Sequence, residues 1–441
     1  MLTEGIPYKS ILKFALPLML ANILQQLYTT VDTIVVGNFI SQNALAGVGA
    51  CMYIAGLYIS IAIALALGVG VLVSQSYGAC DEGKMKRAAS TGTMLMLLLG
   101  VGVSVFSYFT SEPILKHFVS VPEEVLHLSV VYAKTYSVGL IFQFGYNCFA
   151  AILRAVGNSR SSLYFLIITT VVNVVLDLLF VIVFKLGVVG VAVATCISQL
   201  VAMVISYVYM VRNYPIFRPQ FEFELPVVKD IFKTGVPLTI QALIVNCGFM
   251  IMQKIANSFG VGMTASYAVS CRLELYMIVP IVSMLHAVST FAGQNLGANK
   301  LYRLGEGVRQ AILMNLCIAL LVGSFCFVAA PWLISLFALK GEAYRYALSH
   351  VRVASVDLLF YAMYTPVSGL CIGIGKSFVL SVISLVELSG RIIFALLLAG
   401  VIGAGCVWWS EALAWIFVVI LVFIYYNKVL RKEIENKLGE G

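Results

Sequence analysis

Residues 14–37 read FALPLMLANILQQLYTTVDTIVVG, an apolar stretch long enough to cross a lipid bilayer as a helix. At about 1.5 Å per residue it spans roughly 36 Å, whereas the hydrocarbon core is about 30 Å thick. Gln25, Tyr28 and Asp32 follow one another at i, i+3 and i+7, which places them on one helical face. An ionised carboxylate costs about 2.5 kcal/mol or more inside a membrane, so Asp32 is a candidate functional residue. The structural alternative is a carboxyl that only joins helices by hydrogen bonds.

The composition of the whole chain excludes a soluble fold. Of its 441 residues, 61% are hydrophobic and only 11% are charged, whereas soluble domains carry about 25% charged residues. The sequence therefore predicts an all-α polytopic membrane protein. Its ten cysteines are scattered without a CxxC motif, so they indicate neither a disulfide framework nor a zinc site. The four histidines are too dispersed to form a local metal motif.

Apolar runs separated by short polar loops predict about twelve membrane spans. The longest polar connection, 212–233, divides these spans into two sets of six. We therefore predict a six-helix lobe over 1–211, a cytoplasmic linker over 212–233, and a second six-helix lobe with a short basic tail over 234–441. The predicted spans are 14–37, 45–74, 88–110, 129–152, 162–184, 187–211, 234–258, 262–290, 308–334, 350–374, 377–398 and 400–427.

Basic residues gather on one side of the predicted membrane. Most of the 28 lysine and arginine residues fall near both termini, in the 212–233 linker and in alternate loops. Because cytoplasmic loops are enriched in Lys and Arg, both termini are predicted to be cytoplasmic, in the cell (inner) membrane. The net charge of +8 is explained by these loops and does not indicate nucleic-acid binding. The opposite loops chiefly hold Lys116, Lys185, Lys340 and Arg345.

The two halves of the chain repeat each other. KFALP at 13–17 recurs as KTGVP at 233–237, QSYGA at 75–79 as QNLGA at 294–298, and LRAVG at 153–157 as CIGIG at 371–375. A fourth match pairs GVVG at 187–190 with GVIG at 400–403. Because each half has an even number of spans, the halves are parallel repeats, an arrangement that places a binding cavity between them and suits alternating access. Duplicated bundles also form channels or scaffolds, which is the alternative.

Polar residues in three spans are predicted to lie at similar depth. Counted from the outer ends of their helices, Asp32 lies about 9 Å, Asp177 about 12 Å and Thr195 about 13 Å below the surface. Asn173 precedes Asp177 by one turn on the same face. Such oxygen ligands suit a small hard cation such as Na⁺, or a carboxyl that takes up a proton.

The repeat supports a specific role for these acids. The counterparts of Asp32 and Asp177 in the second half are Met252 and Ala395, so the acids are not a general requirement of the fold. Packing by buried acids is the alternative.

A second polar seam is predicted to contact an organic, cationic ligand. Tyr136, Gln143, Tyr146 and Asn147 share one face of the fourth span. The tenth span carries Asp357, Tyr361 and Tyr364, and its two tyrosines are the repeat counterparts of Gln143 and Tyr146. Aromatic side chains facing each other from two halves suit a cation. Packing is again the alternative. With Gln25 and Tyr28, these residues make up the candidate substrate cavity.

Other charges in the second half have no assigned function. Glu387 and Arg391 are four residues apart and are predicted to pair on one helix. Arg272 and Glu274 are two apart and therefore need partners from other helices, and the role of Glu411 is open. No GxxxxGK[ST], HExxH or GxSxG motif is present, so no enzyme activity or nucleotide-driven transport is predicted. Uphill transport would then use an ion gradient.

The chain resembles the multidrug and toxic compound extrusion (MATE) transporters, in particular their DinF-like branch. The resemblance covers essentially the whole length and rests on the first span around Asp32, on QSYGA, on Asn173 and Asp177, and on QNLGA. It implies a V-shaped two-lobe bundle that exports organic cations and drugs against an influx of Na⁺ or H⁺. It also implies a coupling site in the first lobe at Asp32, Asn173, Asp177 and Thr195. Residues 234–260 hold no acid, a departure from the NorM-like branch that favours the DinF-like assignment.

Two rival functions remain open at this stage. A lipid-linked saccharide flippase of similar architecture needs a cationic cavity for a pyrophosphate, to which Arg272 and Arg391 would contribute. An ion channel would show high flux without coupling to a counter-ion. The leading hypothesis is a secondary antiporter without cofactors, whose partners are small organic molecules and the lipid bilayer, with no nucleic acid and no obligatory protein partner.

Overall fold

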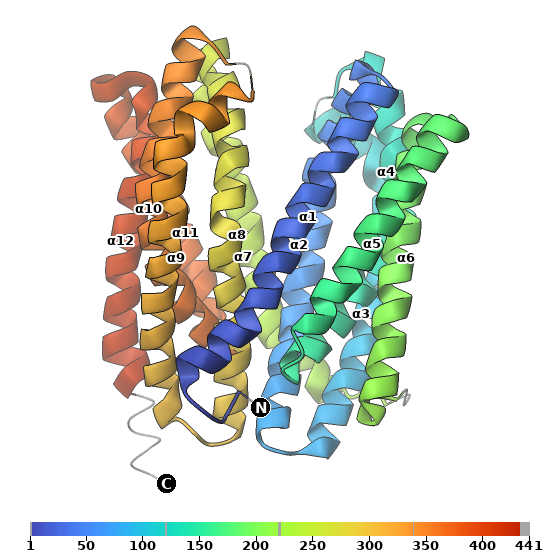
Figure 1. Cartoon of the computed structure of the whole chain (residues 1–441), viewed down its shortest axis with the longest axis vertical. Helices are drawn as coiled ribbons and strands as arrows, with labels where there is room; N and C mark the ends of the chain where they lie inside the picture. Colours follow the sequence, from blue (N-terminus) through green and yellow to red (C-terminus); the bar gives the residue numbers. More distant parts are fainter. Residues whose placement is uncertain (1, 120, 219–221, 338, 433–441) are drawn as a thin grey trace. The chain divides into compact units, whose positions relative to one another are not determined.

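A computed structural model describes residues 2–119, 121–218, 222–337 and 339–432, without the side chains of residues 28–34, 38, 42 and 53. This part of the chain is helical and contains no strand (Figure 1). The predicted all-α fold is confirmed. The long helices are α1 (Pro7–Phe39), α2 (Gln42–Gly78), α3 (Glu82–Pro113), α4 (Glu123–Ala155), α5 (Arg160–Leu178), α6 (Gly187–Asn213), α7 (Leu225–Ser258), α8 (Val261–Gly297), α9 (Tyr302–Ser335), α10 (Gly341–Gly373), α11 (Phe378–Ile402) and α12 (Cys406–Tyr425).

Short helical segments of other types interrupt or extend these helices. Three are π-helical turns that continue α3, α5 and α12, and two are 3-10 turns, one before α7 and one between α11 and α12. They are η1 (Ile114–Phe118), η2 (Leu179–Val183), η3 (Pro215–Phe217), η4 (Gly403–Gly405) and η5 (Tyr426–Leu430).

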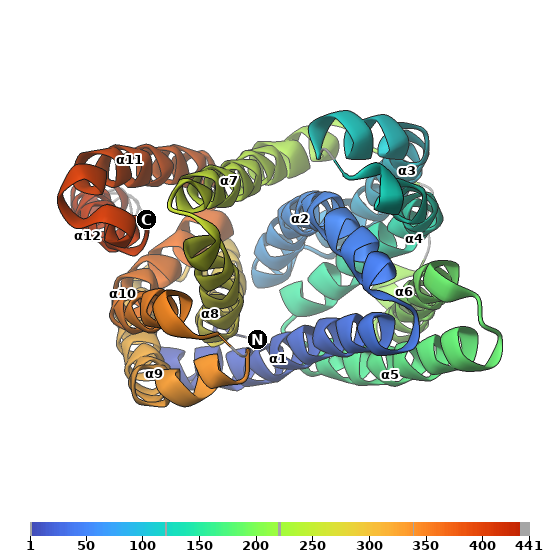
Figure 2. The same cartoon turned by 90° about the horizontal axis from the view of Figure 1, so that it is seen from above.

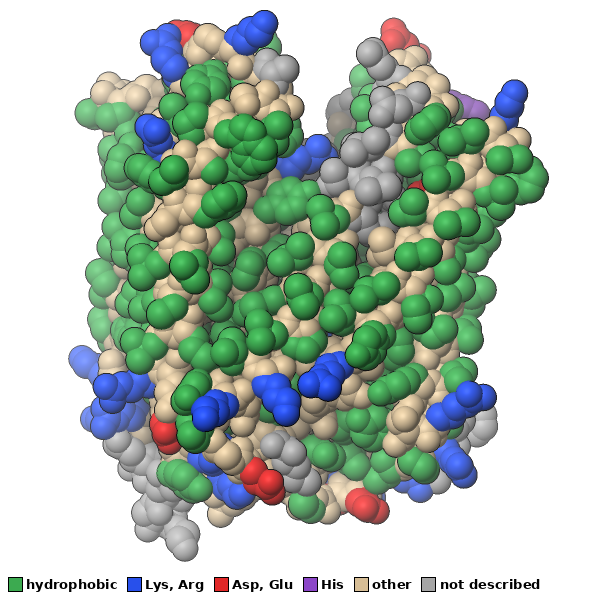
Figure 3. All heavy atoms as spheres, viewed as in Figure 1, with side chains coloured by type: hydrophobic (Ala, Val, Ile, Leu, Met, Phe, Trp, Pro, Cys, Tyr) green, Lys and Arg blue, Asp and Glu red, His purple; other side chains and the backbone are tan. Residues whose placement is uncertain are grey.

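The long helices have the length and apolarity that a membrane requires. Eleven stretches of the described chain meet this condition, and the last of them, Phe378–Leu430, contains both α11 and α12. The chain turns between these two helices at Gly403, whose φ of +57° favours glycine. The break predicted at residue 399 therefore lies at 403–405. In each unit described below, hydrophobic side chains cover the middle of the visible surface and charged side chains gather toward the ends (Figure 3).

The chain forms two compact units, each of which is described by itself. The N-terminal unit comprises Leu20–Thr239, and the C-terminal unit comprises Ile240–Gly441 together with Met1–Met19. Both boundaries fall inside helices, α1 and α7, whereas the sequence predicts a division at the 212–233 linker. That functional division into lobes stays a prediction.

Hydrogen bonds explain why the start of the chain belongs with the C-terminal unit. The backbone N–H of Leu2 donates to Gln294 Oε1 at 2.8 Å, and that of Tyr8 donates to Gln310 Oε1 at 2.8 Å on α9. Arg303 donates from Nη2 to the Gly5 carbonyl at 2.9 Å. The QNLGA motif thus anchors the segment that leads into α1.

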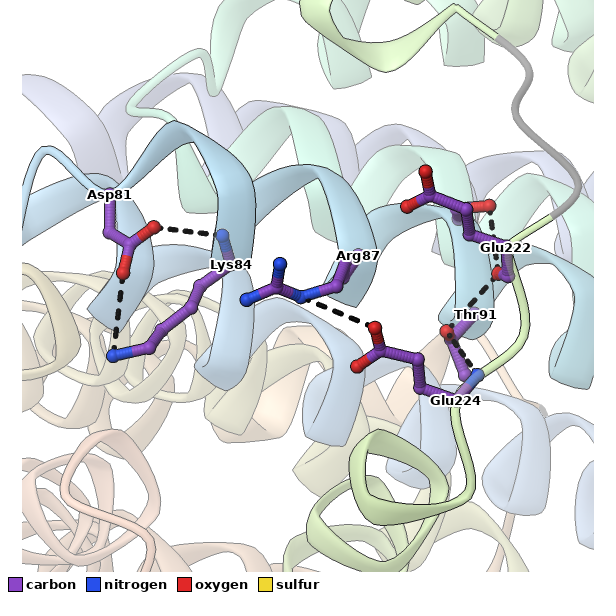
Figure 4. A network of polar contacts seen from close by, with 7 residues as sticks. Asp81, Lys84, Arg87, Thr91, Glu222 and Glu224 are labelled. Carbon is purple, nitrogen blue, oxygen red and sulfur yellow. Dashed lines mark hydrogen bonds and ion pairs between the residues drawn. The ribbon is translucent and has the colours of Figure 1, made fainter.

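The N-terminal unit holds the segment before α7 in the same way. The Glu224 N–H donates to Thr91 Oγ1 at 3.2 Å, and Arg87 Nε lies 3.4 Å from Glu224 Oε1 (Figure 4). Thr91 also donates to the Glu222 carbonyl at 3.3 Å. Thr91 and Gln310, the two side chains that accept these N–H groups, occupy equivalent positions in the two halves of the repeat. The sequence repeat therefore reappears as a repeated docking contact on α3 and α9.

Backbone conformation supports two of the repeat matches and corrects the fourth. Cys80 and Asn299, which follow the QSYGA and QNLGA motifs, have φ of +53° and +55°. Gly157 and Gly375 have φ of +90° and +79°. However, Gly187 begins α6, whereas Gly400 lies inside the last turn of α11. The fourth match therefore does not pair structurally equivalent positions.

The fourth helix of each set is the packing centre of its unit. In the N-terminal unit α4 packs against α2, α3 and α6, and in the C-terminal unit α10 packs against α8, α9 and α12 (Figure 2). Glycines permit the close crossings. A Cβ atom on Gly369 of α10 would lie 2.7 Å from the Leu285 carbonyl oxygen of α8. One on Gly145 of α4 would lie 2.5 Å from Met203 Sδ of α6. A larger residue at Gly369 would meet the α8 backbone and separate the two helices, whereas at Gly145 it would displace the flexible Met203 side chain.

The start of α3 provides a pH-dependent test of local stability. The Lys84 N–H donates to Asp81 Oδ1 at 2.9 Å, and this bond to the carboxylate lowers the pKa of Asp81 (Figure 4). A lowered folded-state pKa contributes stability that is present at neutral pH and lost as the pH falls through that pKa. We expect Asp81→Ala to lower the Tm slightly at pH 7, and the difference from wild type to shrink in acid. Asp81→Asn, which keeps a capping oxygen, is the control. A pH-independent difference for Asp81→Ala would contradict this assignment.

Candidate functional site

Helix α5 carries a buried polar face in the N-terminal unit. Asn173 and Asp177 have no exposed surface, and Thr169, one turn earlier, is 9% exposed. The opposite face is apolar and open, with Val171 and Val175 more than half exposed. This polarity suits a membrane helix whose polar side chains point into the protein and whose valines contact lipid. Asp177 is therefore buried within the protein, and its estimated depth in the membrane stays a prediction.

A change of helix type follows directly after this face. Asp177 is the penultimate residue of α5, and the π-helical turn η2 (Leu179–Val183) continues it. Turns of this kind inside helices are frequent at functional sites.

Helix α6 packs against α5 and adds a buried hydroxyl. Thr195 is 5% exposed, and its hydroxyl donates to the Val191 carbonyl at 3.0 Å, so its oxygen still offers lone pairs. The Cys196 thiol donates to the Thr135 carbonyl at 3.3 Å and ties α6 to α4. The side chains of Asp32 and Tyr28, predicted at the same site or next to it, lie outside the described residues. We call Asn173, Asp177 and Thr195 the α5–α6 face, because they are the buried predicted coupling residues of two helices that pack together. Amide, carboxylate and hydroxyl oxygens suit a proton or a hard cation.

The polar seam of α4 is largely packed inside the N-terminal unit. Gln143 and Asn147 are buried, and Asn147 Nδ2 donates to the Gln143 carbonyl at 2.9 Å. Tyr136 stacks on Tyr132 with ring centroids 6.1 Å apart. Tyr146 is half-buried, whereas Gln25 on α1 is exposed. Tyr136 thus has a packing role, and the ligand role of this seam stays a prediction.

The α10 seam lies within an aromatic cluster of the C-terminal unit. The ring of Trp415 on α12 lies 5.0 Å from Tyr361 and 5.4 Å from Tyr364, centroid to centroid. Tyr364 Oη accepts a hydrogen bond from Gln241 Nε2 at 3.3 Å. Asp357, one turn before Tyr361, is buried. Sequence reasoning missed Trp415, although its position one turn after Glu411 was a usable signal.

A second buried polar group lies on α11 and α12. Arg391 donates from Nε to Glu387 Oε1 at 2.8 Å, which confirms the predicted pair. Its Nη2 also lies 2.8 Å from Glu411 Oε1, a partner that the sequence did not predict. Arg391 and Glu387 are both less than 10% exposed. Arg272 is exposed and Glu274 is half-buried. That their partners come from other helices stays a prediction.

The repeat relates this charge group to the α5–α6 face. In the second half of the repeat, the counterparts of Thr169, Asn173 and Asp177 are Glu387, Arg391 and Ala395. On α5 this face thus carries two uncharged polar residues and an acid. On α11 the equivalent face carries an ion pair and an alanine. Ala395 and Met252 both belong to one cluster of buried apolar side chains.

Comparison with known proteins identifies a family and bacterial relatives of this chain. The sequence model of the MatE family matches residues 17–179 and again 237–397, two segments that agree with the internal repeat. The probable multidrug resistance protein YoeA of Bacillus subtilis is 28% identical over 367 residues, which cover 81% of this chain and 78% of the relative. YpnP of the same organism, also described as a probable multidrug resistance protein, is 26% identical and covers 96% of each chain.

Solved structures share the fold. One is described as the outward-facing conformation of a multidrug resistance MATE family transporter of the MOP superfamily. It matches with a TM-score of 0.92 at 23% identity and covers 99% of this chain and 98% of its own.

Proposed function

Because the chain belongs to the MatE family and is a multi-pass membrane transporter rather than an enzyme, we propose that it exports organic cations in exchange for H⁺ or Na⁺. The α5–α6 face carries this proposal, because Asn173, Asp177 and Thr195 are oxygen donors buried in an apolar unit. An ionisable residue inside a membrane is energetically costly, and such residues usually mark an ion or substrate pathway. The multidrug resistance proteins among its relatives support the substrate class.

We assign ion coupling to Asp32, Asn173, Asp177 and Thr195. Met252 and Ala395, the repeat counterparts of the two acids, belong to one apolar cluster, which supports placing Asp32 and Asp177 together as a pair. Two carboxylates held close in an apolar environment cannot both ionise without a cation, so the pair would take up H⁺ or Na⁺. Assignment to the DinF-like branch stays a prediction.

The flippase alternative loses support from the surroundings of Arg391. Its guanidinium is held by Glu387 and Glu411, so it is neutralised and is not available to a pyrophosphate. The aromatic cluster of Tyr361, Tyr364 and Trp415, with buried Asp357 nearby, suits a cation better than an anion.

Transport into vesicles tests the proposed function. Inverted membrane vesicles that contain the protein are incubated with a fluorescent organic cation. A Na⁺ gradient and a pH gradient are imposed in separate experiments. We expect concentrative uptake with one gradient and none without a gradient. Rapid flux that is independent of both gradients would instead identify a channel.

Drug and coupling ion are expected to bind antagonistically. If drug binding is coupled to release of the ion from these acids, each ligand must lower the affinity of the protein for the other ligand by the same factor. The apparent drug Kd, measured by fluorescence titration of purified protein, should rise by about fivefold or more as Na⁺ rises or pH falls, whichever ion couples. Asp32→Asn should remove that dependence. An unmutated protein whose drug affinity is indifferent to both ions would show that the acids do not couple transport.

The basic loops are expected to face the cytoplasm, and cysteine labelling tests this topology. Ser41 caps the start of α2, and Lys84 lies in the first turn of α3, just beyond the other end of α2; both are exposed, so they report opposite sides of the membrane. In a cysteine-free background, an impermeant maleimide added to intact cells should label Ser41→Cys and leave Lys84→Cys unlabelled until the cells are opened. Labelling of Lys84→Cys from outside, with Ser41→Cys protected, would reverse the assignment.

A further inference from the structure

Three helices of the C-terminal unit bring together a histidine and two carboxylates. Glu274 lies on α8, His350 on α10 and Glu411 on α12. One ligand atom from each lies within 4.8 Å of those from the other two. The spacing of the four histidines along the sequence predicts no local metal motif. Tertiary packing nevertheless places His350 beside acids from two other helices.

The imidazole of His350 is buried with its polar atoms unsatisfied. The residue is 1% exposed, and neither Nδ1 nor Nε2 has a hydrogen-bond partner among the described residues. Its ring stacks on Tyr267 and on Trp408, with centroids 5.8 Å and 5.7 Å apart. These stacking contacts fix the orientation of the imidazole ring. A buried polar group left without a partner costs about 1–3 kcal/mol, so this arrangement favours a ligand that a ring nitrogen can bind.

The charges around His350 also favour a cation. One guanidinium, that of Arg391, contacts two carboxylates, Glu387 and Glu411, and its single charge balances only one of them. Asp357 is buried as well, and its Oδ1 lacks a partner among the described residues. Among the described residues, this cluster thus contains one guanidinium, that of Arg391, and four acidic side chains: Glu274, Asp357, Glu387 and Glu411.

We propose that Glu274, His350 and Glu411 form a binding site for a divalent transition-metal ion of the Zn²⁺ class. An imidazole with two carboxylates suits Zn²⁺, Co²⁺ or Mn²⁺, whereas Mg²⁺ and Na⁺ prefer oxygen ligands alone. Ligand atoms about 2.0–2.2 Å from an ion lie up to about 4 Å apart, so small side-chain rotations suffice. Glu411 would share its two oxygens between the ion and Arg391. The site belongs to the C-terminal unit and does not depend on the proposed coupling site.

Metal titration of the purified full-length protein tests this site. Protein stripped with a chelator is titrated with Co²⁺, whose visible absorption reports low-symmetry coordination by nitrogen and oxygen, and with Zn²⁺ in competition. We expect one saturable Co²⁺ per chain that Zn²⁺ displaces. His350→Ala and Glu274→Gln should each weaken binding by about tenfold or more. His286→Ala, which removes another histidine, on α8, and Cys271→Ser, which removes the thiol nearest to Glu274 in the sequence, are the matched controls and should bind as wild type does.

Thermal unfolding gives a second readout that also checks folding. A ligand that binds only the folded protein raises the Tm, so Zn²⁺ should raise the Tm of wild type and of both controls, and Mg²⁺ should not. The Tm of Glu274→Gln should respond little to Zn²⁺, even if His350→Ala fails to fold. The proposal is overturned if wild type binds no Co²⁺, if His350→Ala and Glu274→Gln fold and bind it as wild type does, or if Mg²⁺ or Na⁺ displaces it at equal concentration.

Discussion

Asp177→Asn is expected to abolish gradient-driven export while the protein still folds and enters the membrane. The substitution keeps the size and shape of the side chain but removes the charge and the proton that the carboxyl can exchange. Asp177 is fully buried at the end of α5, so solvent does not replace that charge. Uptake of a fluorescent cation into inverted vesicles should fall to the level of vesicles without the protein, and Asp32→Asn should have the same effect.

Matched variants separate this effect from a loss of folding. Asp230→Asn makes the same chemical change at an exposed position on α7 and should transport as wild type does. Thr195→Val should reduce transport less than Asp177→Asn, because a hydroxyl can assist an ion without carrying its charge. Size-exclusion profiles must show that each variant is monodisperse. Normal transport by both Asp177→Asn and Asp32→Asn would mean that these acids only hold helices together.

Arg391→Met is expected to destabilise the C-terminal unit by about 3–5 kcal/mol, because it leaves the Glu387 and Glu411 carboxylates buried without their basic partner. The guanidinium joins α11 to α12, so the loss should appear as a large drop in Tm in detergent. The measurement is thermal unfolding followed with a thiol-reactive dye, which reacts with the buried cysteines of this unit as they become exposed.

Two comparisons make the Arg391 prediction specific. Arg345→Met breaks an exposed ion pair with Glu342, in which both side chains are more than 70% exposed, and should change stability by about 1 kcal/mol or less. The triple variant Arg391→Met, Glu387→Gln, Glu411→Gln removes the excess charge and should recover much of the lost stability. An Arg391→Met protein with the wild-type Tm would show that the ion pair contributes little.

The helical architecture could be predicted from the sequence, because a membrane leaves a chain few choices. Backbone groups in lipid must be hydrogen-bonded within a helix, so each long apolar run had to become one. Twelve runs, their repeat and the buried face of Asn173 and Asp177 could all be read from spacing. The pair of Glu387 and Arg391 was equally readable, because residues four apart on a helix must be neighbours.

The contacts between helices, and the side chains that meet there, depend on tertiary packing. No spacing rule connects Leu2 to Gln294 or Glu224 to Thr91, so the docking of the segments that lead into α1 and α7 was not predictable. The same holds for Glu411, which completes the Arg391 group, and for His350, which packing brings to Glu274 and Glu411. Local periodicity specifies the face of a helix. The partner of that face depends on the long-range packing of side chains, including the glycine crossings that let α8 and α10 approach.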